Sequence, residues 1–490
     1  MSLLSLPSEM NLLISSHLNS PKNLLSFLRT SQKFYHLLIN ELYQHNIRSD
    51  GGSALLWYAS RGDELGVRNM LRAGANVNLR SPNRAQSTAL LEAVSTKHTS
   101  VVQALLENGA LPDVADARSR RPLVLATNGR SDVAITKLLL EHGAIANSVA
   151  FDKYAPLREA VRSNQESKVA LLLKHGADTH ILDRRTGMTL VHIAASKNAT
   201  PGIINILLSS GVQLESQDNM GRTPLQVAAD HSCTRAVRLL LNLGANPNFK
   251  NNNQYWKGWS ALFYAATNPS IPGNGRKSII RALFLHGAEL DGRNHAQKTP
   301  LHHAISKGAI KQAQALVECG ASIMATDANG DTVLHIAASS SSWCPSMECV
   351  RKLLLLGADV QFRNNDGLTP LSLAVRMGSI EATKILLEHG SCADSRDKNG
   401  KSPLHYAAEA GNVHKIVKLL IQYGADVNSR DILGFTPLHK IVAKEDTWEA
   451  AGELLKAGAD RYAIAGDGNF PHDMVPDGVW AETKRSLIRF

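Results

Sequence analysis

A glycine followed by alanine or a similar residue ends an apolar stretch at nearly regular intervals along this 490-residue chain. It occurs at Gly74, Gly109, Gly143, Gly176, Gly211, Gly244, Gly287, Gly320, Gly357, Gly390, Gly424 and Gly458. Successive glycines are 33 to 37 residues apart, except for the 43 residues between Gly244 and Gly287. Such self-similarity predicts stacked units, each of which contacts only its neighbours. The usual prior of about 150 residues per globular domain therefore does not apply.

One unit shows how the period is built. Ser402 suits an N-cap, and Pro403 suits the first helical position, where its missing N–H costs no hydrogen bond. Residues 413–420 then place apolar side chains at i, i+3, i+4 and i+7, as in an amphipathic helix. Gly424 can adopt the left-handed conformation that ends such a helix. Because each helix is too short to be stable alone in water, we expect neighbouring units to supply the core.

A second signal recurs in register with the glycines. It reads Thr-Pro-Leu-His at residues 299–302 and 436–439, and Ser-Pro-Leu-His at 402–405. With this motif and its period, the chain over residues 51–475 resembles the ankyrin-repeat family. The resemblance implies an all-α fold, an α-solenoid of about twelve ankyrin repeats, each a helix-turn-helix with a β-hairpin finger. It also implies that the concave face binds other proteins.

The first 50 residues lack the period. They open with Leu6-Pro7-Ser8-Glu9 and continue with three short apolar patterns, which predict three small helices with a marginal core. This segment resembles an F-box. The resemblance implies that a Skp-type adaptor of a cullin ligase docks on a set of apolar residues: Leu6, Pro7, Ile14, Leu24 and Leu28. The alternative is a helical cap for the first repeat, because solenoids need polar-faced ends. Residues 476–490 are expected to form a C-terminal capping helix.

No catalytic arrangement is evident in the sequence. The histidines of the Thr-Pro-Leu-His motifs are expected to bond their own repeat, and those before the terminating glycines to favour the helix dipole. Cys344 and Cys349 have no second pair at zinc-ligand spacing. We therefore expect a non-enzyme with no metal and no cofactor. The five cysteines favour a reducing compartment, and with no apolar run of membrane length we expect a soluble cytoplasmic or nuclear protein.

The net charge of +10 is spread thinly, with nine of the ten excess positive charges between residues 51 and 350. Duplex-binding proteins concentrate basic residues on one element, so a nucleic-acid partner is disfavoured. We expect an acidic protein partner instead.

One irregular unit is the main candidate for partner binding. The 43-residue interval lengthens a finger that contains Tyr255, Trp256 and Trp259, in a chain with 5% aromatic residues. Tyr and Trp dominate interface hot spots, so these three are candidate partner-binding residues. The alternative is that they pack on neighbouring fingers. The residue before each Thr position varies, which adds a further set of finger candidates: Arg222, Leu368, Lys401 and Phe435.

Two functions follow from these features. In the first, residues 1–50 join a cullin-type ubiquitin ligase and the repeats hold the protein target for modification. In the second, the chain is a scaffold or transcription coregulator that binds and masks a partner without ubiquitination. The sequence does not identify the target protein.

Overall fold

The computed structural model describes residues 43–49, 51–128, 132–148, 155–267, 275–339, 346–410, 412–444, 447–476 and 486. It divides between Asn219 and Met220 into two units, each considered by itself. The adaptor candidates of the first 42 residues lie outside the described residues, as does nearly all of the expected C-terminal capping helix. None of the helices in the described ranges has the length and apolar character that a bilayer span requires.

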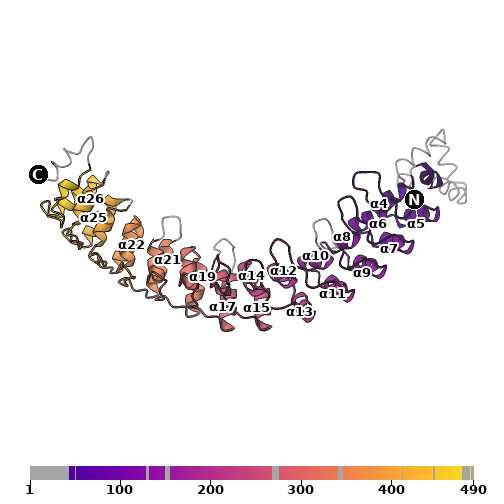
Figure 1. The fold of residues 1–490 in the computed structure, drawn as a ribbon, viewed down its shortest axis with the longest axis horizontal. Helices are drawn as coiled ribbons and strands as arrows, with labels where there is room; N and C mark the ends of the chain where they lie inside the picture. Colours follow the sequence, from indigo (N-terminus) through magenta and orange to yellow (C-terminus); the bar gives the residue numbers. More distant parts are fainter. Residues whose placement is uncertain are drawn as a thin grey trace. The chain divides into compact units, whose positions relative to one another are not determined.

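The first unit consists of helix pairs. Its helices are α4 (Ala54–Arg61), α5 (Glu64–Arg72), α6 (Ala89–Thr96), α7 (Thr99–Glu107), α8 (Pro122–Thr127), α9 (Val133–Glu141), α10 (Pro156–Arg162), α11 (Glu166–Lys174), α12 (Leu190–Ser196) and α13 (Pro201–Ser209). The first helix of each pair packs on the first helix of the next pair, and the second on the second, which gives two parallel rows (Figure 1). Residues 43–49 are also helical, and the ring of Tyr43 meets that of Tyr58 in α4 edge-on at 6.2 Å.

The second unit repeats this arrangement from Met220 onward. Its elements are α14 (Pro224–Asp230), α15 (Thr234–Asn242), α16 (Ala261–Ala266), α17 (Gly275–Leu285), α18 (Pro300–Ser306), α19 (Ile310–Glu318), α20 (Val333–Ser339), α21 (Ser346–Leu355), α22 (Pro370–Arg376), α23 (Ile380–Glu388), α24 (Pro403–Ala407), α25 (Val413–Gln422), α26 (Pro437–Val442), α27 (Trp448–Lys456) and the short 3-10 helix η2 (Pro471–Met474). The core lies between the two rows, where leucine, isoleucine, valine and alanine side chains are fully buried.

The predicted helix boundaries follow from local chemistry. All twelve repeat-ending glycines have a positive φ, between 78° and 104°, as expected for the position after a helix. At the start of α18, Thr299 Oγ1 accepts from the His302 backbone N–H, and Thr299 Oγ1 lies 2.8 Å from His302 Nδ1. The same reciprocal cap begins α24 and α26.

The motif histidines are structural, as the sequence indicated. In His302 and His405, Nδ1 accepts from the backbone N–H of the N-cap residue, which leaves Nε2 to donate. Nε2 then bonds a carbonyl of the next repeat, that of Asp331 for His302 and that of Phe435 for His405. Burial lowers the pKa of both histidines. Each imidazole is therefore a neutral bridge between consecutive repeats.

The fingers differ from the β-hairpins that the family resemblance implied. The described residues contain no strand, only two isolated bridges, Arg80–Thr88 and Thr326–Thr332. Aspartate or asparagine side chains close several of these turns, with or without a bridge beside them.

Candidate protein-binding surface

Several fingers of the second unit are turns closed by one side-chain oxygen. In the finger of residues 430–435, Asp431 Oδ1 accepts from the backbone N–H groups of Leu433 (3.0 Å) and Phe435 (2.9 Å). The Asp431 N–H in turn donates to the Phe435 carbonyl at 3.0 Å. Asp327, Asn364 and Asp397 close their fingers in the same way. Satisfying two backbone donors with one oxygen fixes the turn without a strand ladder.

Neighbouring fingers are joined through their backbones. The N–H of Lys398 donates to the Asp366 carbonyl at 3.0 Å, and the N–H of Ile432 donates to the Asn399 carbonyl at 3.0 Å. The N–H of Gly466 continues the row to the Leu433 carbonyl at 2.7 Å. These bonds hold the finger tips of this part of the second unit in a fixed row, from which their side chains project.

The long finger, residues 250–259, is equally well fixed. The Asn251 N–H donates to the Trp259 carbonyl at 3.0 Å, and the Gly258 N–H donates to the Asn251 carbonyl at 2.7 Å. The Asn251 amide Nδ2 donates to the Met220 carbonyl and to the Tyr264 hydroxyl oxygen, both at 2.9 Å. The lengthened finger therefore forms an ordered projection.

Its three aromatic residues occupy different environments. Trp259 is buried, stacks on Phe263 with 5.5 Å between ring centroids, and meets the His303 ring at 4.6 Å. Trp256 is half-buried and contacts Trp259 edge-on at 4.6 Å. Tyr255 is 77% exposed. Trp259 thus packs the base of the finger and Tyr255 projects from its tip, while partner binding by the three residues stays a prediction.

His303 is the unusual group beneath this finger. Burial lowers its pKa to about 4, with Lys307 and Lys298 acting in the same direction. Its Nε2 is buried and has no hydrogen-bond partner among the described residues. The aromatic rings of Trp259 and Phe263 surround it instead, so the imidazole is held neutral as part of an apolar cluster.

The remaining finger candidates are mostly packed against their own repeat. Arg222 is 9% exposed and pairs with Asp230 at 3.1 Å, while Leu368 is 3% exposed. Lys401 and Phe435 are half-buried. The Lys440 ammonium lies 3.6 Å from the centre of the Phe435 ring. Their role toward a partner stays a prediction.

The structure adds exposed residues that the sequence analysis did not select. Ile432 and Leu433 are 68% and 60% exposed at the tip of their finger, and Ile464 is 52% exposed on the next. An open hollow of about 650 Å³ lies between these two fingers. The sequence does contain a signal for this exposed site. Ile and Leu stand between Asp431 and Gly434, whereas the fingers of residues 363–368 and 396–401 have polar residues at the corresponding positions.

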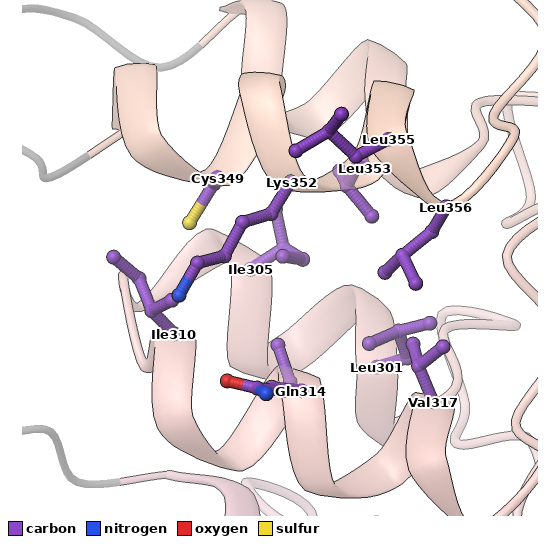
Figure 2. A pocket seen from close by; sticks show the side chains of 11 residues that line it. Leu301, Ile305, Ile310, Gln314, Val317, Cys349, Lys352, Leu353, Leu355 and Leu356 are labelled. Atoms are coloured by element: carbon purple, nitrogen blue, oxygen red, sulfur yellow. The ribbon is translucent and has the colours of Figure 1, made fainter.

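A second hollow lies away from the fingers, between α21 and the pair α18 and α19. Figure 2 shows Leu353 and Leu355 of α21 opposite apolar side chains of α18 and α19, with Lys352 lying across one side toward Ile310. Its volume is about 210 Å³, and its lining is almost entirely apolar. The Lys352 ammonium pairs with Glu348 of its own helix at 3.0 Å, and Leu355 at the margin is 82% exposed.

Within the ranges that the structure describes, no three or more His, Cys, Asp or Glu residues lie close enough together to hold a metal ion.

Comparison with known proteins gives a consistent result. The family described as "Ankyrin repeats (3 copies)" matches residues 176–251, 243–327, 262–344 and 334–431, and the single ankyrin repeat matches 86–117. Human B-cell lymphoma 3 protein is 38% identical over 161 residues, which are 32% of this chain and 34% of that protein. The E3 ubiquitin-protein ligase KEG of Arabidopsis thaliana is 28% identical over 366 residues, 72% of this chain and 20% of that protein.

Among solved structures, the ankyrin repeat domain of Bcl-3 aligns at 29% identity with a TM-score of 0.39, over 55% of this chain and 99% of that one. The matched part spans about a third or less of the length of the two curated relatives named above.

Proposed function

This chain belongs to the ankyrin-repeat family, and on that basis we propose that it binds a protein target through its fingers and performs no chemistry itself. The observation that carries the proposal is a row of fingers with fixed backbones and exposed apolar tips, such as Tyr255, Ile432 and Leu433. Apolar side chains on a fixed backbone bind a partner without the entropic cost of ordering the loop that carries them.

We propose further that the chain is a substrate receptor of a cullin-type ubiquitin ligase. In this scheme Leu6, Pro7, Ile14, Leu24 and Leu28 bind a Skp-type adaptor, and the repeats hold the target. Support comes from the F-box resemblance of residues 1–50 and from the partial likeness to a plant E3 ubiquitin-protein ligase. The enzymes of the ligase would carry out the transfer, so this chain needs no catalytic residue.

Affinity purification of the full chain from cells tests this scheme. We expect the wild type to retain a Skp-type adaptor and a cullin, and the variant Leu6→Asp/Pro7→Ala to lose both while keeping the target. The variant Tyr255→Ala provides the matched control, because it should weaken target binding and leave the adaptor in place. Absence of adaptor and cullin from the wild-type sample would refute the receptor scheme.

The second candidate function is a scaffold or coregulator that masks its partner. Its support is the 38% identity to human B-cell lymphoma 3 protein over a third of this chain. Target half-life separates the two functions, because a receptor shortens it when overproduced and a masking protein leaves it unchanged or lengthens it. Both functions place the chain in the cytoplasm or nucleus.

Both proposed functions use the same partner-binding residues. We propose a surface centred on the long finger, with Tyr255 as the exposed anchor and Trp256 and Trp259 behind it. The other finger candidates extend it along the row: Arg222, Leu368, Lys401 and Phe435.

A further inference from the structure

Two neighbouring fingers of the second unit carry positive charge and no negative charge. Residues 250–259 contain Lys250 and Lys257, residues 292–298 contain Arg293 and Lys298, and neither stretch contains an aspartate or glutamate. Lys250, Lys257 and Arg293 are exposed, and Lys298 is half-buried. None of the four forms an ion pair with any residue in the part of the chain that the structure describes. We call residues 250–259 and 292–298 the basic finger pair.

The two fingers form one continuous surface. The His295 N–H donates to the Lys257 carbonyl at 3.1 Å. Gly258 has a φ of +84°, and a Cβ added there would lie 2.8 Å from the Asn294 Cα, so only glycine allows the fingers to approach this closely. The four cations are therefore held on adjoining turns rather than scattered over the molecule.

The residues that close these turns keep the pair free of negative charge. Asn294 Oδ1 accepts from the N–H groups of Ala296 (3.0 Å) and Lys298 (2.9 Å), the same bonds that Asp327, Asp397 and Asp431 accept in later fingers. Asn251 likewise stands where those fingers have aspartate, and its Oδ1 accepts from the Asn253 N–H at 2.7 Å. An amide oxygen provides the hydrogen bonds of the turn without the charge of a carboxylate.

The exposed aromatic ring of Tyr255 lies among these cationic residues. Tyr255 falls between Lys250 and Lys257 in the finger, and its backbone N–H donates to Asn253 Oδ1 at 3.1 Å, which fixes the turn that presents it. On the preceding finger Met220 is 48% exposed, and its carbonyl accepts from Asn251. Apolar contact area thus adjoins the cations on a rigid backbone.

From these observations we propose that the basic finger pair binds an extended acidic segment of a partner protein, with an apolar side chain of that segment packed against Tyr255. The proposal rests on the protein-binding function above and names the kind of segment that is bound. Exposed cations mainly raise the association rate and give salt-sensitive affinity, while the buried ring contact slows dissociation.

A protein segment fits this surface better than a nucleic acid does. Single-stranded nucleic acids bind by stacking successive bases on successive aromatic rings. Tyr255 is the one largely exposed ring of the finger, since Trp256 lies edge-on against Trp259. The Arg293 guanidinium also donates to the Thr326 carbonyl at 2.6 Å, which restricts its freedom to grip a phosphate bidentately.

Selection from a phage-displayed library of random peptides tests the proposal. Peptides of about twelve residues span about 40 Å when extended, enough to cross two fingers. The full chain is compared with the variant Lys250→Glu/Lys257→Glu and with the control Lys311→Glu/Lys415→Glu, which reverses two exposed charges on α19 and α25. Circular dichroism checks that all three are folded.

We expect wild type and control to select peptides rich in Asp and Glu with a nearby Leu, Phe or Tyr. Synthetic copies of these peptides should bind the Lys250→Glu/Lys257→Glu variant at least about tenfold more weakly than wild type. The Tyr255→Ala substitution should also lower their affinity, by a factor that does not depend on the salt concentration. Three results would overturn the inference: no selected peptides, peptides without acidic enrichment, or equal losses in variant and control. The inference would also be overturned if the chain bound an oligothymidylate instead of acidic peptides and the Lys250→Glu/Lys257→Glu variant lost that binding. That result would favour a nucleic acid as the ligand.

The outcomes also separate this inference from the proposed function. Peptides or cellular targets that bind the chain undiminished by Lys250→Glu/Lys257→Glu would leave protein binding intact and remove the acidic-segment surface. If the chain retains no protein target in the affinity purification, the proposed function fails, whatever the peptide result.

Discussion

Arg276 bonds the ends of two neighbouring helices, so replacing it should destabilise this region. Its side chain is almost fully buried at the start of α17, and its guanidinium donates to the carbonyls of Tyr264 (2.9 Å), Ala265 (3.1 Å) and Asp230 (2.8 Å). These carbonyls lie at the carboxyl-terminal ends of α16 and α14, where the helix has no internal donors left. One side chain thus satisfies the ends of two helices.

Replacing Arg276 with Met removes all three bonds and leaves buried acceptors unpaired. Each unsatisfied buried acceptor costs about 1–3 kcal/mol. Two effects reduce the total: the Tyr264 carbonyl keeps a second donor in the Thr267 hydroxyl, and the substitution removes the cost of burying the charged guanidinium. We expect a net loss of about 3 kcal/mol in the free energy of opening this region. Arg276→Lys should recover only part of it, since one ammonium cannot match the planar fork.

The matched control is Arg281→Met on the same helix. Arg281 is exposed and pairs with Glu318 at 3.1 Å, and a surface pair of this kind is worth about 0.5 kcal/mol or less. Because a repeat array can open locally, hydrogen exchange of peptides covering α16 and α17 is the suitable assay. A 3 kcal/mol loss corresponds to exchange faster by about a hundredfold. Equal effects of the two substitutions, or no effect of Arg276→Met, would refute the reasoning.

Three further predictions concern the long finger and its surroundings. The pKa of His303 is about 4, below the ordinary histidine value of 6.5, so its contribution to stability is full above pH 6.5 and is lost as the pH falls through 4. The loss is about 3 kcal/mol, and urea unfolding of His303→Phe should show a correspondingly flatter pH profile. Gly258→Ala should cost more than Gly287→Ala in the same assay by about 1 kcal/mol or more, because both have a positive φ and only Gly258 has a neighbouring backbone within contact. Trp259→Ala should lower stability by about 3–5 kcal/mol and Tyr255→Ala by less than about 0.5 kcal/mol, and equal losses would show that the exposed ring also packs.

The helix pairs were predictable because their signals are local. The N-cap, the proline after it, the apolar stripe and the final glycine all act within one repeat, and each is observed where the sequence placed it. The neutral, bonded state of His302 and His405 also follows from the motif, although their carbonyl partners lie in the next repeat.

The exposed surface was less predictable, because the orientation of a finger residue depends on contacts between repeats. Leu368 and Leu433 are both finger leucines, yet the first is 3% and the second 60% exposed. Leu368 stands directly before the N-cap and turns toward the core, whereas Leu433 lies at the tip. Arg276 was not among the residues selected from the sequence, because its burial depends on where α14 and α16 end.

The bonds between fingers have a consequence for how binding can change over evolutionary time. Along the row from Asp366 to Gly466, the bonds from tip to tip join backbone N–H groups to backbone carbonyls, so they do not depend on which side chains occupy the non-glycine tip positions. A substitution at a tip therefore alters the chemistry offered to a partner while leaving the spacing of the row intact. Recognition can then diverge one finger at a time, without a compensating change in the repeats on either side.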